Sequence, residues 1–269
     1  MNSEETLTQD IVNTGKSMLW EFGNQLDCPG KVKLKTSLLF LARTIRQLDA
    51  IGKLANARFV SDGCILFRSM LERYFLFVHL CKMHEFEVFD DWCFKSQYVQ
   101  LNAIKSIREF SGKPQIRQRR FSSEDKARYR RVCADELVKQ WRRPDIESIA
   151  RDLKMKFLYD AGYDWSSAYV HPVSTDGTVD YLHLMGRAEE ADANDIPTLV
   201  GNARLISVLH IRHFMNEPEY NWRHILYDLI DAFAETAGGQ DCDYQGMSQA
   251  VQQLHRSGSG LLSKTPART

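Results

Sequence analysis

The order of apolar and polar residues predicts a chain of long helices, one of which is apolar on nearly every face. Residues 64–80 read CILFRSMLERYFLFVHL, and a helix with this distribution is buried in a protein core. Polar and charged residues, among them Arg68, Glu72 and His79, interrupt the run, so it is not expected to span a membrane. Arg68 and Glu72 are four residues apart and share a face, and such side chains are rarely buried without a partner. This polar stripe on an apolar helix indicates either an ion pair that stabilises the fold or side chains that line a functional site.

Apolar residues recur at intervals of three and four along most of the chain, which indicates amphipathic helices. The expected helices cover residues 4–25, 33–56, 58–83, 86–110, 146–159, 195–215 and 219–236. We therefore expect one all-α multi-helix bundle over residues 1–240 and a mobile C-terminal tail over residues 241–269. An irregular insertion is expected around residues 173–194, with a short strand or an extended loop at residues 178–184.

Composition limits the class of protein. The 269 residues carry no formal net charge and are 43% apolar, which is ordinary for a globular domain. The chain shows no signal peptide and no run that would span a bilayer, and its six cysteines form no C-x-x-C pair. These features favour a reducing, cytoplasmic location without a membrane partner. Isolated histidine pairs such as His210 and His213 are weak metal candidates, so no metal and no cofactor are expected.

The segment between Lys113 and Arg143 departs from this balance, with eleven Lys or Arg against four Asp or Glu, a net charge of +7. Ser122-Ser123-Glu124-Asp125 is typical of a helix start close to a capping box. The segment is either a solvated charged face or a surface that contacts phosphates. In the second interpretation the substrate-binding residues are Arg117, Arg119, Arg120, Arg128 and Arg131.

A second set of polar residues suggests a site. Ser167 and His171 are four apart and face together if this stretch is helical, and Pro172 places His171 near the helix end. Histidine transfers protons near neutral pH and arginine binds phosphate through its planar fork, so His171, Arg68 and Glu72 could form one site. The alternative is a buried Arg68–Glu72 ion pair that serves the fold alone. Another pair, Arg204 and His210, has an Arg-x5-His spacing that also arises by chance.

The motif FRSMLERY resembles the Arg-x3-Glu helix of an uncharacterised, all-helical bacterial family of unknown function. The second mark of that family, a Tyr followed by Ser-x3-His, corresponds to Tyr163, Ser167 and His171-Pro172. The family is itself similar to the HEPN superfamily, helical bundles that include metal-independent ribonucleases of toxin–antitoxin and antiphage systems. HEPN nucleases use an Arg-x4-6-His motif, usually at a dimer interface. Asp164 stands here where that arginine is expected.

The resemblance implies a HEPN-like endoribonuclease that acts as a toxin or antiphage defence effector. His171 and Arg68 would be catalytic, Glu72 and Ser167 would orient them, and Tyr163 would contact the substrate. The implied partners are RNA, an antitoxin or other defence-system protein, and a second copy in a homodimer. Asp164 and the neutral charge favour the alternative, a non-catalytic helical module that binds a protein or nucleic-acid partner. A metal-dependent enzyme is the third hypothesis.

Overall fold

The computed structural model describes residues 3–23, 31–106, 121–171, 177–187, 195–216 and 224–237. Within these ranges every regular element is a helix and no strand occurs, which confirms the predicted all-α bundle. None of the described helices is long and apolar enough to cross a membrane. The tail predicted for residues 241–269 lies outside the described ranges.

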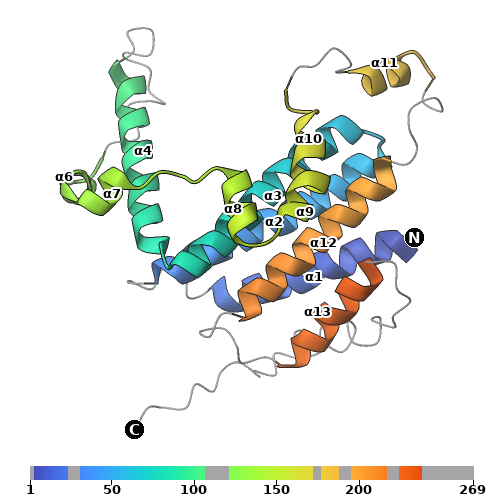
Figure 1. Cartoon of the computed structure of the whole chain (residues 1–269), viewed down its shortest axis with the longest axis horizontal. Helices are drawn as coiled ribbons and strands as arrows, with labels where there is room; N and C mark the ends of the chain where they lie inside the picture. Colours follow the sequence, from blue (N-terminus) through green and yellow to red (C-terminus); the bar gives the residue numbers. More distant parts are fainter. Residues whose placement is uncertain are drawn as a thin grey trace.

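The main bundle of the described part consists of long helices that were expected from the apolar periodicity. They are α1 (Ser3–Gly23), α2 (Val32–Asn56), α3 (Val60–Met83), α12 (Asp195–Asn216) and α13 (His224–Ala237). Helix α2 packs against α1, α3 and α12, and α13 packs against α12 (Figure 1). Their buried faces carry Leu, Ile, Val and Phe at three- and four-residue spacing, so each helix covers its apolar stripe with its neighbours.

Helix α3 is the central helix of this bundle. Its large aromatic side chains, Phe67, Tyr74, Phe75 and Phe77, are at most 1% exposed, which confirms the predicted burial. The apolar residues do not close the whole circumference, because one stripe of α3 is only partly covered. That stripe carries half-buried polar residues, namely Arg68, Ser69, Glu72 and Arg73.

A second group of helices extends away from the bundle (Figure 1): α4 (Phe86–Ser106), α6 (Ser123–Ala134) and α7 (Glu136–Gln140). The predicted capping box is present, since the Asp125 amide donates to Ser122 Oγ at 2.9 Å and the Ser122 amide donates to the Asp125 carboxylate at 2.8 Å. Helix α6 packs on α4 through stacked rings, with Tyr98 lying 3.9 Å from Phe121 and 4.0 Å from Tyr129 between ring centroids. We call α4, α6 and α7 the arm.

The chain returns from the arm to α3 through short elements: α8 (Ile146–Asp152), α9 (Lys156–Leu158), the π-helix η2 (Tyr159–Asp164) and α10 (Trp165–Ser167). The helix expected over residues 146–159 is interrupted, because Lys154 adopts a left-handed backbone with φ 59°. The Met155 amide then donates to the Ala150 carbonyl at 2.7 Å and closes α8. Elements α8, η2 and α10 all pack on α3, and η2 and α10 place Tyr163 and Ser167 against its polar stripe.

The irregular insertion around residues 173–194 contains one element that the sequence did not reveal. Residues Thr178–Leu184 form helix α11, so the expectation of a short strand or extended loop there was wrong. Gly177 precedes the helix with a left-handed backbone, φ 76°, and its carbonyl accepts from the Tyr181 amide at 2.8 Å. The alternation of polar and apolar residues over these seven positions was too short to separate strand from helix.

Candidate functional site

The guanidinium of Arg68 is the centre of a polar cluster between α3 and the segment η2–α10. Its Nε donates to Ser167 Oγ at 3.1 Å, and its Nη2 donates to the Tyr163 hydroxyl at 2.8 Å. The Cζ atom of Arg68 also lies 4.7 Å from the Tyr163 ring centroid, within the range of a cation–π contact. The structure thus brings together three of the predicted site residues, which come from positions almost one hundred residues apart.

Gly162 allows the two elements to approach this closely. A Cβ atom at Gly162 would lie 2.9 Å from Leu71 Cδ1, so a larger residue would have to displace the end of that side chain, while its distance of 3.5 Å from Phe67 Cζ is an ordinary contact. The π-helical turn from Tyr159 to Asp164 contains Gly162 and adds a residue to the turn before Ser167. Turns of this kind are rare and occur frequently at functional sites.

Among the described residues, the Arg68 guanidinium contacts hydroxyl groups and no carboxylate. Ser167 Oγ donates its proton to the Tyr163 carbonyl at 2.6 Å, so its lone pairs face the Arg68 Nε–H. Tyr163 is further oriented by the Tyr159 ring, which stacks on it with centroids 5.2 Å apart. Arg68 therefore has two neutral acceptors in fixed positions, and its remaining N–H groups point elsewhere.

Glu72 does not pair with Arg68. Its Oε1 lies 3.1 Å from Nη2 of Arg143, in the linker that follows α7. The Arg68–Glu72 ion pair, one of the two alternatives, does not form, and the two residues make separate sets of contacts one turn of α3 apart. Among the residues that the structure describes, no carboxylate forms an ion pair with Arg68. The half-buried positive charge of Arg68 is left without a neutralising partner there, which is the condition that favours a bound anion.

His171 lies at the edge of this cluster. The His171 amide donates to the Ser167 carbonyl at 3.2 Å, so the helical turn continues to residue 171 and places the two side chains on one face. The His171 side chain is exposed, and no contact with Glu72 is found in the described part of the chain. The structure thus gathers Arg68, Tyr163 and Ser167, with His171 one turn away and Glu72 engaged by Arg143.

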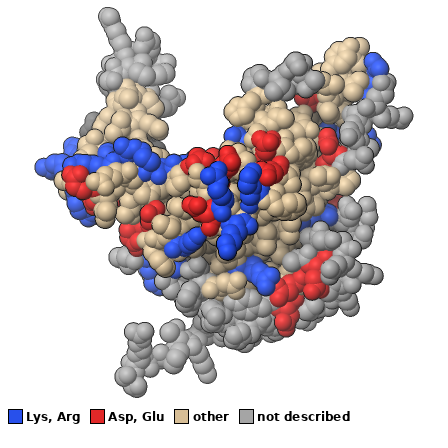
Figure 2. Space-filling model, viewed as in Figure 1, with Lys and Arg blue, Asp and Glu red and all other residues tan. Residues whose placement is uncertain are grey.

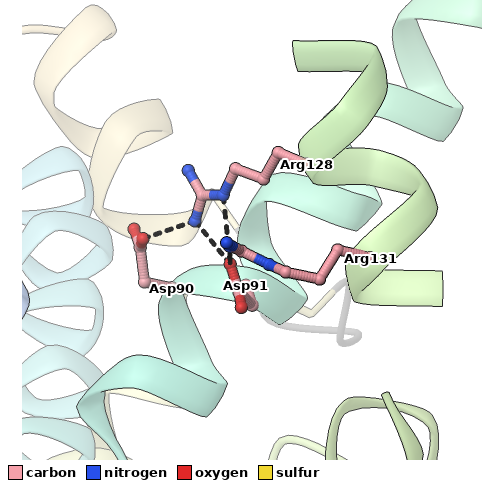
Figure 3. Close-up of polar contacts among 4 residues, drawn as sticks. All are labelled: Asp90, Asp91, Arg128 and Arg131. Atoms are coloured by element: carbon pink, nitrogen blue, oxygen red, sulfur yellow. Dashed lines mark hydrogen bonds and ion pairs between the residues drawn. The ribbon is translucent and has the colours of Figure 1, made fainter. Parts of the chain in front are cut away.

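The basic segment is neutralised in part where the structure describes it. Arg128 donates to both Asp90 and Asp91 of α4, at 2.6 and 2.7 Å from its Nη2, and Arg131 lies 3.8 Å from Asp91 (Figure 3). Arg128 also covers the Phe94 ring at 4.3 Å. These contacts attach α6 to α4 and so stabilise the fold of the arm. Arg117, Arg119 and Arg120 lie outside the described residues.

The face shown in Figure 2 carries mixed charge at its middle, whereas Lys and Arg form a band over α6, α7 and the linker to α8. Figure 2 shows Lys and Arg beside Asp and Glu over the middle of this face, where α8 and α9 lie. Lys156 and Asp160, with 2.5 Å between Nζ and Oδ1, and Arg151 and Glu147, at 3.1 Å, are ion pairs of these elements. Such exposed pairs contribute little to stability and produce no single-sign field.

The other histidine candidates belong to the core. His210 is fully buried, stacks on Phe77 at 4.6 Å and shares a hydrogen bond of 3.0 Å with Thr44 Oγ1. Arg204 is buried too and donates to Thr8 Oγ1 at 2.8 Å, so the Arg-x5-His spacing of Arg204 and His210 lies inside the bundle. A search of the described residues finds no group of three His, Cys, Asp or Glu side chains that could coordinate a metal.

Sequence reasoning missed several polar partners near the stripe. Gln47 of α2 accepts from Arg73, and Arg143 pairs with Glu72. The Arg143 pair joins residues 71 positions apart. No local spacing signals such pairs. The one available signal was the run of polar residues on an apolar helix, which extends to Arg73.

Comparison with known proteins supports the family resemblance. A family model described as a family of unknown function (DUF5677) matches residues 35–186, more than half of the chain. The matched range begins within α2 and ends just after α11, so it contains the Arg68, Tyr163 and Ser167 cluster together with Glu72 and His171. No curated protein and no solved structure matches the chain.

Proposed function

The chain belongs to this family of unknown function, and we propose that it is a HEPN-like, metal-independent endoribonuclease whose Arg68 site binds an RNA phosphate. The proposal rests on the hydrogen-bond partners of the Arg68 guanidinium. Its half-buried guanidinium has two neutral hydroxyl partners, Tyr163 and Ser167, and no carboxylate partner among the described residues. A phosphate oxygen is a natural ligand for the remaining N–H donors, because arginine binds phosphate through a planar fork.

The chemistry requires one proton-transfer group beside the bound phosphate, and His171 fills this role in the proposal. Neutral His171 takes the proton of the ribose 2′-hydroxyl while the 2′-oxygen forms a bond to phosphorus. The bond between phosphorus and the 5′-oxygen breaks, and that oxygen receives a proton from the imidazolium. The products are a 2′,3′-cyclic phosphate and a 5′-hydroxyl end. Arg68 stabilises the charge that develops on the phosphoryl oxygens.

Two arrangements assist these groups. Ser167 and Tyr163 hold the Arg68 fork in one orientation before substrate arrives, so little reorganisation is needed during the reaction. The exposed position of His171, one helical turn beyond Ser167, lets a strand approach from solvent. The HEPN resemblance adds a role as toxin or antiphage effector, with an antitoxin or defence-system partner and a homodimeric assembly.

The second candidate is a non-catalytic module that binds RNA or a protein through the same cluster. Two observations favour it. Asp164 stands where a HEPN nuclease carries its motif arginine, and Glu72 faces Arg143 and so is not positioned to orient His171. Binding at Arg68 is common to both candidates, so the difference between them depends on His171.

Cleavage of total RNA by purified protein in the presence of a chelator separates the two candidates. We expect His171→Asn to lower the rate by about 10²–10⁴-fold, because that is the usual contribution of a general acid–base group. His84→Asn is the matched control: His84 is exposed at the end of α3, and asparagine tolerates its left-handed backbone, φ 57°. Equal cleavage rates for wild type and His171→Asn would exclude His171 as the proton-transfer group, and no cleavage by the wild type would favour the binding module.

A further inference from the structure

A second group of arginines lies across the polar stripe from Tyr163 and Ser167. Arg73 of α3 donates through Nη1 to Gln47 Oε1 of α2, so its guanidinium lies over α2. Arg43 is one helical turn before Gln47 and shares its face of α2. Next to Arg73 in the sequence is Glu72, which is paired with Arg143. Arg43 and Arg143, from separate parts of the chain, are both near enough to Arg73 for their charges to act on it.

Neutral groups hold Arg73 in place. Besides Gln47, its Nη2 donates to Ser69 Oγ at 3.4 Å, and Gln47 is oriented in turn because its Nε2 donates to the Leu66 carbonyl at 3.2 Å. Gln47 is 2% exposed, so this partner is a buried, immobilised amide. The arrangement repeats the feature found at Arg68: a half-buried guanidinium fixed by uncharged acceptors.

The group of Arg43, Arg73, Arg143 and Glu72 carries more positive than negative charge. Glu72 and Arg143 neutralise each other at 3.1 Å, while neither Arg43 nor Arg73 forms an ion pair with any described residue. Burial and the charge of Arg43, followed by that of Arg143, lower the pKa of Arg73 to about 10, although Glu72 opposes this shift. The two neighbouring arginines are thus close enough to repel Arg73, and a bound anion would relieve that repulsion.

We propose that Arg43, Arg73 and Arg143 form a second anion subsite, which binds the phosphate next to the one bound by Arg68. The proposal rests on the proposed function and narrows its substrate to a single strand with at least two phosphates. Arg68 and Arg73 are five residues apart, about 7.5 Å along the axis of α3. This rise is comparable with one nucleotide step of an extended strand. The two residues are also turned by about 140° around α3, toward Tyr163 and toward Gln47, so the strand crosses the polar stripe between the two subsites.

Inorganic tripolyphosphate tests the subsite without RNA. Calorimetric titration at low salt should show binding by the wild type and a loss of affinity on the order of tenfold in Arg43→Gln and in Arg73→Gln, as expected for one charged hydrogen-bonding group. Arg43 is exposed and supports no described contact, so Arg43→Gln remains informative if Arg73→Gln disturbs the Gln47 contact. Arg151→Gln, an exposed substitution on α8, is the matched control and should bind as the wild type does.

Titration with 2′-O-methyl oligonucleotides, which cannot be cleaved, links the subsite to the strand. Extension from two to three nucleotides adds a second phosphate, and this should raise the affinity of the wild type and of Arg151→Gln but not that of Arg43→Gln. Wild-type RNA binding that is unchanged in Arg43→Gln and Arg73→Gln would overturn the subsite and leave the proposed function standing. Arginine-dependent tripolyphosphate binding without oligonucleotide binding would support the anion site and overturn the RNA assignment. Binding of neither ligand would overturn both.

Discussion

The two half-buried arginines of α3 show how the identity of a partner decides the role of a charged residue. An arginine paired with carboxylates is electrically satisfied and serves the fold, as Arg128 does with the partly exposed Asp90 and Asp91. Arg68 is instead fixed by Ser167 and Tyr163, which accept hydrogen bonds but carry no charge. The positive charge therefore remains available to a ligand, while its position is already set before binding.

His210, in contrast to Arg68, is a titratable group that burial keeps uncharged. Its burial predicts that stability depends on pH. Burial, together with the charge of Arg73 and with His213, lowers the pKa of His210 to about 3. The unfolded chain binds this proton at its ordinary pKa of about 6.5, so the contribution of His210 is fully present above pH 6.5 and is lost as the pH falls towards 3. We expect the free energy of unfolding to decrease by up to about 1.4 kcal/mol per pH unit on this account.

Urea unfolding between pH 7 and pH 5 measures this slope. His210→Leu should flatten the dependence relative to the wild type, whatever its effect on stability at pH 7. His84→Asn, which replaces an exposed histidine, should leave the slope as it is. Identical slopes for wild type and His210→Leu would show that the folded state does accept the proton on His210.

At the scale of elements, apolar periodicity was enough to predict the long helices but not the turn that builds the site. Helices α2, α3 and α12 end close to their predicted bounds because each presents a continuous stripe to the core. The π-helix around Gly162 and the short helix α11 depend on contacts with α3 and on left-handed backbone positions. Likewise, motif spacing was enough to predict Arg68, Tyr163 and Ser167 as site residues. The Glu72–Arg143 pair could not be predicted in this way, because it depends on tertiary packing.

Gly162→Ala tests whether close packing of η2 on α3 positions the site. The new Cβ would lie 2.9 Å from Leu71 Cδ1, so we expect a loss of about 1–3 kcal/mol in the free energy of unfolding and a weaker Arg68–Tyr163 contact. Gly201→Ala in α12 is the control, because nothing lies within 4 Å of its Cβ, and it should stabilise by about 0.5–1 kcal/mol.

Thermal or urea unfolding reports the first effect, and RNA affinity reports the second. The double variant Gly162→Ala, Leu71→Val should recover part of both losses, because the shorter valine side chain makes room for the added methyl group. A stable Gly162→Ala protein with normal RNA affinity would mean that the close approach is not needed at the site.

At the scale of the whole molecule, the bundle and the arm differ in how they are held together. The bundle buries continuous apolar stripes, whereas α6 is joined to α4 by the Tyr98 stack and by the ion pairs of Arg128 (Figure 3). Removal of a polar contact should therefore loosen the arm without affecting the bundle, since local stability follows the apolar area that each unit buries.

Arg128→Ala makes this difference measurable. The ion pairs are partly exposed, with 32% of the Arg128 side chain accessible, so we expect an effect of about 1 kcal/mol that is confined to the arm. Hydrogen exchange should quicken in α6 and remain unchanged in α2. RNA affinity and its salt dependence should also stay the same, because Asp90 and Asp91 already neutralise this guanidinium.

Arg131→Ala is the informative comparison for the arm. Arg131 lies on the same helix, but its side chain is 71% exposed and lies 3.8 Å from Asp91. Its charge is therefore less neutralised by Asp91 than that of Arg128 is. If the arm takes no part in binding, neither variant changes RNA affinity, whereas Arg68→Ala lowers it. A loss in Arg131→Ala but not in Arg128→Ala would extend the RNA-binding surface from the α3 stripe onto α6. An equal loss in both would mean that the strand displaces Asp90 and Asp91 from Arg128, and the assignment of Arg128 to the fold alone would then be wrong.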